Sequence, residues 1–445
     1  MNLIRQRAAN RRRLMEKLPD GLVLLAGGIE AIRNNDVSYV FRQRSNFLYL
    51  TGVPEPGYFL LLDPRRKSAV LFIPRVDAHH RVWLGHVPGP AEAARTYGFR
   101  EVRYADELSA LARERRRGYR ALYAELPALA RARAAVRGLA NKPAVLADTL
   151  DGLRICKAPA EVDQIVRASQ VTARAHLAAM REARPGMREY EVQARFERIC
   201  VEAGLRHMGY PSIIAAGRNA AVLHYGKNDA RISAGDLLLV DAGAESEGYS
   251  SDITRTFPVG RRFSRRQRDI YSIVLEAQKG CIRRARAGVL SGDLHVHAMR
   301  TIAEGLKSLK ILRGPTDDLV LGGAVRLFYP HGLSHTLGLD VHDTLGGKHR
   351  KVPMPEHVRV RFNAHLEPGF VITMEPGIYF IEALLRDPAL RRKHKDQVDF
   401  RRADSFLDFG GIRIEDDLVI TASGPARNLT QVPKEIDAVE AACGL

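Results

Sequence analysis

The sequence predicts an α+β protein with two domains, one over residues 1–155 and a larger one over residues 156–445. The chain has 445 residues, which is more than the usual length of a single domain. Its first part alternates short apolar runs with helical patterns, as α/β domains do. A long helical pattern then begins at Pro159, and this change places the domain boundary near residue 155.

The N-terminal domain is predicted to be α/β. Residues 2–18 have an amphipathic helical pattern, and GLVLLAGG at 21–28 is an apolar run ended by glycines, which is typical of a buried strand. The runs NFLYLTGV, YFLLLDP and SAVLFIP, between Asn46 and Pro74, are separated by turn residues and are predicted as three strands. Residues 90–139 alternate helical stretches with short strands.

The larger domain is predicted to combine long helices with strands. Pro159, followed by the acidic residues Glu161 and Asp163, is typical of a helix start. Further helices are expected over residues 188–204, 264–287 and 292–309. The strand-like runs are SIIAAG, LLLVDAGA, FVITMEPGIYF and GIRIEDDLVIT.

The chain carries a formal net charge of +18, from 69 Lys and Arg against 51 Asp and Glu. Nucleic-acid-binding proteins show such an excess, but the clusters Arg11–Arg13 and Arg115–Arg117 lie in helix-like segments without interleaved aromatic residues. We therefore expect an arginine-rich, solvated surface and no nucleic-acid partner. A positive field would also steer anionic substrates, such as peptides with a free carboxylate, toward the protein.

The cysteines and the apolar runs bear on cellular location. No apolar run approaches the roughly 20 residues of a membrane span, and the basic N-terminal stretch lacks the apolar core of a signal peptide. The four cysteines include no CxxC pair, which indicates free thiols in a reducing compartment. We therefore expect a cytoplasmic protein that does not enter a membrane.

The stretch VDAGAESEGYSSDITRTF, residues 240–257, combines a hairpin pattern with two aspartates. With Glu245–Gly248 as a four-residue loop, Asp241 lies directly opposite Asp252. Opposed side chains on one face lie about 4.5–5.5 Å apart, so two ionised carboxylates there repel each other. A cation between them removes this conflict. The alternative is a different register, in which one aspartate belongs to the turn.

Further candidate ligands follow in the same domain. HGLSHTLGLDVHD contains His331, His335 and His342, but its glycines and the missing glutamate of HExxH exclude a zincin helix. Glu375 in VITMEPG and Glu415 in GIRIEDD lie in strand-like runs, where a buried carboxylate needs a partner or a metal.

The proposed ligand set is rich in oxygen and consists of Asp241, Asp252, His335, Glu375 and Glu415. Four carboxylates with one imidazole favour Mn²⁺, with Co²⁺ and Zn²⁺ as alternatives, over a structural zinc held by thiolates. Four negative charges also balance two divalent ions, so the set indicates a two-metal site about 3.5–4 Å across with bridging carboxylates. For Glu415 the alternative is an ion pair with Arg413 on the same strand face.

In combination these motifs resemble the pita-bread metallopeptidase family, which includes methionine aminopeptidase, aminopeptidase P and prolidase. The matching stretches, in the family's order between residues 160 and 440, are VLHYG, LLVDAGAESEGYSSDITRTF, HGLSHTLGLDVHD, TMEPGIYF and GIRIEDD. The resemblance implies a C-terminal pita-bread fold and a hydrolase that binds two metal ions at the five positions above. It also implies that His224 and His342 contact the substrate and the reaction intermediate, and that His331 is a third active-site histidine.

The N-terminal stretches FRQRSNFLYLTGVPEPGYFLLLD and FIPRVDAHHRVWLG resemble the extra creatinase-like α/β domain of aminopeptidase P and prolidase. The implied activity is hydrolysis of Xaa-Pro bonds. The long insertion after MEPGIYF and Arg361, which matches a prolidase arginine that holds the dipeptide carboxylate, favour an Xaa-Pro dipeptidase. HGLSH is closer to aminopeptidase P, which acts on longer peptides and is the alternative. For Arg361 the alternative is a surface charge.

The resemblance also implies roles for single residues. Glu375 is expected to move a proton from the attacking water to the prolyl nitrogen, while His342 and His224 donate hydrogen bonds to the substrate. Tyr210 and Arg413 are expected in or beside the substrate pocket. The family implies a homodimer and a proline-containing di- or oligopeptide substrate. A non-enzymatic binding module and a metal-free creatine amidinohydrolase are remote alternatives, against which the complete ligand set speaks.

Overall fold

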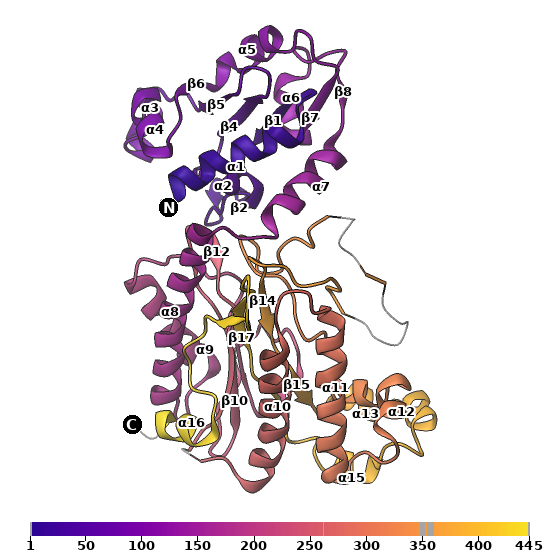
Figure 1. The fold of residues 1–445 in the computed structure, drawn as a ribbon. Helices are drawn as coiled ribbons and strands as arrows, with labels where there is room; N and C mark the ends of the chain where they lie inside the picture. The colour runs from indigo at the N-terminus through magenta and orange to yellow at the C-terminus, as the bar shows by residue number, and fades with distance from the viewer. Residues whose placement is uncertain (1, 261, 348–351, 354–359, 444–445) are drawn as a thin grey trace. The chain divides into compact units, whose positions relative to one another are not determined.

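The computed structural model of the protein describes residues 2–260, 262–347, 352–353 and 360–443 (Figure 1). The chain divides into two compact units. The first contains Met1–Arg154 with Gly346–Lys348, and the second contains Ile155–Leu345 with His349–Leu445. Among the described residues, no helix is both long enough and apolar enough to span a membrane.

The first unit is built on a six-stranded mixed sheet with the order β6-β5-β4-β1-β7-β8. β1 is fully buried, and it pairs antiparallel with β4 and parallel with β7. Because strands cover both of its edges, its continuous apolar composition is that of a central strand. The strands are β1 (Gly21–Ala26), β4 (Phe59–Asp63), β5 (Ser68–Ile73), β6 (Glu101–Tyr104), β7 (Ala121–Ala124) and β8 (Ala140–Asn141).

Helices and one small hairpin complete the first unit. The helices are α1 (Leu3–Lys17), α2 (Ser45–Thr51), α3 (Ala78–Leu84), α4 (Pro90–Tyr97), α5 (Leu108–Arg115), α6 (Leu126–Ala132) and α7 (Pro143–Arg154), with a 3₁₀ turn η1 (Ala105–Glu107). The hairpin consists of β2 (Ile32–Asn34) and β3 (Val37–Ser38).

The prediction of a strand at NFLYLTGV is wrong, because this run forms helix α2. Six of its seven residues are buried. Gly52 ends the helix in the left-handed conformation, with its N–H bonded to the carbonyl of Leu48 at 2.9 Å. A short buried helix and a buried strand share the same continuous apolar composition, so periodicity alone does not separate them.

Arg11, in the first basic cluster, is buried rather than solvated as expected. Its guanidinium donates to the carbonyl of Leu50 at 2.6 Å and to that of Gly98 at 3.2 Å. Leu50 lies in the last turn of α2, where helix carbonyls have no partner within the helix. Part of the basic excess therefore serves the fold of the first unit.

In the second unit, two pairs of long helices flank the strands (Figure 1). α8 (Pro159–Glu182) packs on α9 (Glu189–Glu202), and α10 (Arg265–Arg284) packs on α11 (Ser291–Ser308), which confirms the four long helices that the sequence predicted. Shorter helices are α12 (Thr316–Leu321), α13 (Glu382–Leu385), α14 (Pro388–Lys393), α15 (Phe400–Asp404) and α16 (Ile436–Cys443), with 3₁₀ turns η2 (Gly217–Ala221) and η3 (Ala324–Leu327).

The strands of the second unit are short and antiparallel. They form the sheets β13-β10-β9 and β14-β17-β18 and the pairs β11-β12 and β15-β16. The strand-like runs FVITMEPGIYF and GIRIEDDLVIT each form two strands with an interruption between them. The bounds are β9 (Ile213–Ala216), β10 (Leu237–Asp241), β11 (Glu245–Ser246), β12 (Tyr249–Ser250), β13 (Thr254–Pro258), β14 (Val371–Met374), β15 (Gly377–Tyr379), β16 (Gly411–Arg413), β17 (Asp416–Val419) and β18 (Arg427–Asn428).

The register predicted for the hairpin at 240–257 is wrong by two residues. Asp241 pairs with Thr254, not with Asp252. The turn consists of the two residues Glu247 and Gly248, which have φ angles of 53° and 86°, as in the two-residue turns that join hairpin strands. The two aspartates are therefore diagonal neighbours, a relation in which residues lie about 7–8 Å apart.

The direct opposition predicted for the aspartates occurs at two glutamates instead. β14 pairs with β17 through Met374 and Asp416, and β15 pairs with β16 through Gly377 and Arg413. Both pairs share one register, which places Glu375 opposite Glu415 where both ladders are interrupted. Glu375 and Glu415 therefore bring two carboxylates to the same place in the fold.

Candidate metal centre and active site

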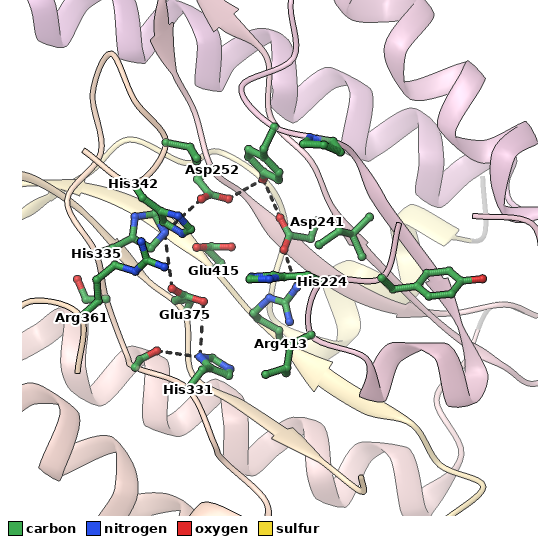
Figure 2. A pocket seen from close by; sticks show the side chains of 18 of the residues that line it. His224, Asp241, Asp252, His331, His335, His342, Arg361, Glu375, Arg413 and Glu415 are labelled. Atoms are coloured by element: carbon green, nitrogen blue, oxygen red, sulfur yellow. Dashed lines mark hydrogen bonds and ion pairs between the residues drawn. The ribbon is translucent and has the colours of Figure 1, made fainter. Parts of the chain in front are cut away.

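A cavity of about 620 Å³ in the second unit gathers every residue that the sequence singled out for a site (Figure 2). These residues come from the β10–β13 hairpin, from loops next to β9 and η2, from the segment between η3 and β14, and from the two interrupted strand pairs. They are Tyr210, His224, Asp241, Asp252, His331, His335, His342, Arg361, Glu375, Arg413 and Glu415.

Asp252, His335 and Glu415 form the tightest group of candidate ligands among the described residues. Each offers one ligand atom, and these atoms lie within 4.8 Å of one another. His335 Nε2 is 3.3 Å from Asp252 Oδ2 and 3.7 Å from Glu375 Oε1. His335 Nδ1 lies 3.1 Å from the carbonyl oxygen of Thr336. That contact fixes the ring so that Nε2 points at the carboxylates, as in many metal-binding histidines.

Asp241 lies in the same cavity and is held by Tyr210 and Arg413. The Tyr210 hydroxyl is 2.7 Å from Asp241 Oδ1 and 2.5 Å from Asp252 Oδ1, so one phenol connects both aspartates. Arg413 Nη2 donates to Asp241 Oδ2 at 2.5 Å. Arg413, the expected alternative partner of Glu415, thus pairs with Asp241, while Glu415 accepts a hydrogen bond from the Thr254 hydroxyl at 2.7 Å.

Burial and mutual repulsion raise the pKa values of carboxyl groups in this cavity and so favour their protonated forms. Burial, with the charge of Asp252 adding to it, raises the pKa of Glu375 to about 8. Burial, followed by the charges of Asp252 and Glu375, raises the pKa of Glu415 well above its usual range. Burial alone would lower the pKa of His335, but the hydrogen bond to Asp252 and the charge of Glu375 raise it to about 9.

The donor set fits divalent metal ions. Carboxylates that repel one another in a buried cavity are stabilised by a cation, which takes the place of the protons. Oxygen donors with one imidazole suit Mn²⁺, Co²⁺ and Zn²⁺. The residues that would hold the ions are Asp241, Asp252, His335, Glu375 and Glu415.

His331 is fixed by two hydrogen bonds. Its Nε2 lies 2.8 Å from the hydroxyl of Tyr379, and its Nδ1 lies 2.8 Å from the carbonyl oxygen of Gly332. Burial, with the charge of Arg413, lowers the pKa of His331 to about 3. The ring is therefore neutral at physiological pH, beside Glu375 at 3.7 Å.

His342 and His224 line the more open part of the cavity, and both side chains are exposed. The ring of His342 packs edge-on against that of His335 with centroids 4.4 Å apart. Partial desolvation by the cavity walls, and then the charge of His335, lower the pKa of His342 to about 4. A neutral imidazole at this place offers one N–H to a ligand in the cavity.

Tyr379 is a site residue that the sequence did not single out. Its hydroxyl accepts from Arg413 Nη1 at 2.8 Å and also contacts His331. The side chain is fully buried. Its hydroxyl connects His331 in the cavity to the arginine that bonds Asp241. It lies in the quoted motif TMEPGIYF, but only the folded arrangement reveals these contacts.

Glu189, the first residue of α9, is a second residue that the sequence did not single out. Its carboxylate is fully buried and accepts four hydrogen bonds of 2.7–3.0 Å from the loop that carries His224. The donors are the backbone N–H groups of Ala216 and Ala230, the amide of Asn219 and the hydroxyl of Tyr225. Glu189 therefore determines the course of residues 216–230.

We expect Glu189→Gln to destabilise the protein by about 1–3 kcal/mol, because an amide nitrogen would then face N–H donors that lose their acceptor. The value of kcat/KM should also fall, since the loop carries His224. Urea unfolding and peptide hydrolysis measure both effects. Glu202→Gln, at the exposed end of the same helix, is the matched control and should change neither. An unchanged unfolding midpoint for Glu189→Gln would contradict this role.

Two family models match the chain. One, described as metallopeptidase family M24, covers residues 163–422, and one described as aminopeptidase P, N-terminal domain, covers residues 7–123. The chain therefore belongs to metallopeptidase family M24 and is an enzyme. These matches confirm the predicted family and the predicted fold, a pita-bread domain preceded by an α/β domain.

Individual relatives have similar lengths. A probable Xaa-Pro aminopeptidase of Fusarium vanettenii is 36% identical over 450 residues, which cover 96% of this chain and 93% of the relative. The Xaa-Pro dipeptidase of Homo sapiens is 33% identical over 456 residues, which cover 98% and 92%. A zinc-substituted aminopeptidase P of Escherichia coli in complex with product superposes with a TM-score of 0.85 at 33% identity, over 99% and 98% of the two chains.

Proposed function

We propose that the protein is a metal-dependent peptidase that hydrolyses Xaa-Pro bonds, with an Xaa-Pro aminopeptidase activity on longer peptides favoured. The observation that carries this proposal is the buried group of Asp252, His335 and Glu415, with Asp241 and Glu375 in the same cavity. The aminopeptidase P relatives and the match of the N-terminal domain support the specificity for proline. They also support aminopeptidase activity over the dipeptidase activity that the sequence favoured.

Bound divalent ions would polarise the scissile carbonyl and lower the pKa of the attacking water. Glu375 is the group that accepts the water's proton and delivers it to the prolyl nitrogen, since its carboxylate lies at the cavity wall beside the other candidate ligands. His342 and His224 donate hydrogen bonds to the substrate carbonyl as negative charge develops on it. His331, fixed by Tyr379, lies beside Glu375, with its Nδ1 3.7 Å from Glu375 Oε2.

Proline is distinguished by what it lacks. A prolyl residue after the scissile bond has no N–H, so a subsite without a hydrogen-bond acceptor at that point does not penalise it. Other residues would bury an unpaired N–H there. Tyr210 and Arg413 both donate hydrogen bonds to Asp241 and are proposed to shape this cavity through that contact.

Xaa-Pro dipeptidase is the second candidate activity, because Arg361 lines the cavity and could hold the carboxylate of a dipeptide. We expect the wild-type enzyme to cleave Ala-Pro-Ala faster than Ala-Pro, and Arg361→Met to leave tripeptide cleavage largely intact. Arg386→Met, an exposed arginine on another segment, is the matched control. The opposite result would be cleavage of Ala-Pro but not of Ala-Pro-Ala, with the rate of Ala-Pro cleavage lowered about 10–100-fold in Arg361→Met because a charge-assisted hydrogen bond is removed. That result would establish the dipeptidase instead.

Three finer properties belong to the same proposal. Manganese is the favoured resident ion, on the chemistry of the donor set. A homodimer is the favoured assembly, as the family resemblance implies. A cytoplasmic location is favoured by the four free cysteines, of which Cys200, Cys281 and Cys443 are buried.

A further inference from the structure

Helix α8 turns a stripe of polar side chains toward the hairpin that carries Asp241 and Asp252. Ser169, Thr172 and His176 are spaced by three and four residues, so they share one face of the helix. All three are fully buried. α8 packs against β11 and β12, which form the end of that hairpin (Figure 1).

Between the β10–β13 and β11–β12 ladders lies a gap of three residues on each arm, which two backbone hydrogen bonds cross: the N–H of Ala242 donates to the carbonyl of Ile253 at 3.2 Å, and that of Ser251 donates to the carbonyl of Ala244 at 3.0 Å. The β10–β13 pairing ends at Asp241, and strand pairing resumes only with β11 at Glu245. The arms between these points, 242–244 and 251–253, approach very closely, since a Cβ on Gly243 would lie 2.0 Å from a backbone oxygen of the other arm. The carbonyl of Gly243 and the N–H of Asp252 bond to groups outside the hairpin, so such groups share with the backbone pairing in setting the separation of the two carboxylates.

His176 bridges both arms at this gap. Its Nε2 lies 3.0 Å from the carbonyl oxygen of Ile253 and 3.3 Å from that of Ala242. One N–H thus donates to residues adjacent to each aspartate. Nδ1 has no partner among the described residues, which leaves the proton on Nε2. The ring packs edge-on against Phe196 at 5.1 Å, which holds it in place.

Thr172 closes a ring of hydrogen bonds one turn away. The N–H of Ala244 donates to its hydroxyl oxygen at 3.1 Å, and this hydroxyl lies 2.8 Å from that of Ser251. The Ser251 hydroxyl donates back to the carbonyl oxygen of Ala244 at 3.2 Å. Both arms are thereby joined through a single side chain of α8.

Ser169 reaches the second aspartate through another carboxylate. Its hydroxyl donates to Asp417 Oδ2 at 3.1 Å, and the same oxygen accepts the backbone N–H of Asp252 at 3.1 Å. The stripe thus contacts the hairpin directly at two levels and, through Asp417, at a third. At each level the partner is backbone beside a candidate ligand or a group bonded to it.

We propose that Ser169, Thr172 and His176 are positioning residues that set the separation of Asp241 and Asp252 and so the affinity for divalent ions. The three side chains are not among the residues that line the cavity. They act on the backbone next to the ligands, and such outer partners typically contribute about 10–100-fold to metal affinity. The inference rests on the metal site of the proposed function.

The test is a titration of metal-free protein with Mn²⁺ alone, in which calorimetry measures the binding affinity. Thr172→Val keeps the shape of the side chain and removes its hydroxyl, and His176→Phe keeps a ring against Phe196 and removes its N–H. Each should weaken Mn²⁺ binding by about 10–100-fold. Thr172→Ser, which restores a hydroxyl, should return the affinity to the wild-type level, and Gln170→Ala on the exposed face of α8 is the control.

The melting temperature of the metal-free variants separates positioning from stability. A lower melting temperature with wild-type Mn²⁺ affinity would make the stripe purely structural and overturn the proposal. If His176→Phe does not fold, the Thr172→Val and Thr172→Ser pair decides by itself. Wild-type protein that binds no Mn²⁺, Co²⁺ or Zn²⁺ would overturn both the metal site and this inference, whereas normal wild-type binding with unchanged variants overturns only the inference.

Discussion

Glu375→Gln is expected to lower kcat by about 10²–10⁴-fold, the usual contribution of a general acid–base group. The amide cannot accept the proton of the attacking water or deliver it to the prolyl nitrogen. It also removes one negative charge from a cavity in which Glu375 lies opposite Glu415, so Mn²⁺ binding should weaken as well. Peptide hydrolysis under saturating Mn²⁺ separates the loss in kcat from the loss in occupancy.

Glu382→Gln is the matched control for this substitution, because its carboxylate is exposed on α13 and pairs only with a surface arginine in the part of the chain that the structure describes. It should leave kcat and Mn²⁺ affinity unchanged. A Glu375→Gln enzyme that retains most of its kcat at full metal occupancy would assign the proton transfer to another group in the cavity.

Removal of the metal by a chelator is expected to abolish peptide hydrolysis and to lower the melting temperature. A ligand at 1,000 times its dissociation constant stabilises the folded state by about 4 kcal/mol, and this contribution is lost with the ion. Readdition of Mn²⁺ should restore both properties. Metal analysis of the purified protein identifies the resident ion in the same experiment, and full activity in the chelated sample would contradict the proposed function.

The pH dependence of the metal-free form follows from the raised pKa values. Glu375 has a pKa raised from 4.5 to about 8, and His335 one raised from 6.5 to about 9. Between these limits the folded state holds protons that the unfolded chain has released, so the stability of the metal-free protein should fall as pH rises. Binding of Mn²⁺ near pH 7 should release protons, which calorimetry in buffers of different ionisation enthalpy measures.

The chemistry of the site was predictable because each ligand lies in a short motif. Asp252 and Glu415 are acidic residues in otherwise apolar or strand-like stretches, where an unpaired carboxylate is costly. That reasoning needs only the local sequence. The cavity brings these residues together from segments more than 100 positions apart, as the motifs required.

The geometry was less predictable, because register depends on the turn. Glu247 occupies a position with φ of 53°, which Asn or Gly usually fills, so the pattern gave no sign of a two-residue turn. A longer loop was the natural reading, and it shifted the pairing of Asp241 by two residues. Likewise, the helical spacing of α8 could be predicted from the sequence. The role of its polar side chains, such as Ser169 and His176, follows only from their contacts in the folded structure.

The interruption of β14 and β15 at Glu375 has a consequence for how the enzyme can misfold. A slip of these strands by two residues keeps every side chain on its own face, yet it displaces Glu375 from Glu415 by about 6.8 Å, at about 3.4 Å for each residue. Such a molecule would retain its secondary structure and its core but could not share ions between the two glutamates. The molar ratio of bound metal to protein in a refolded sample therefore measures the fraction of molecules in which these strands have the native register.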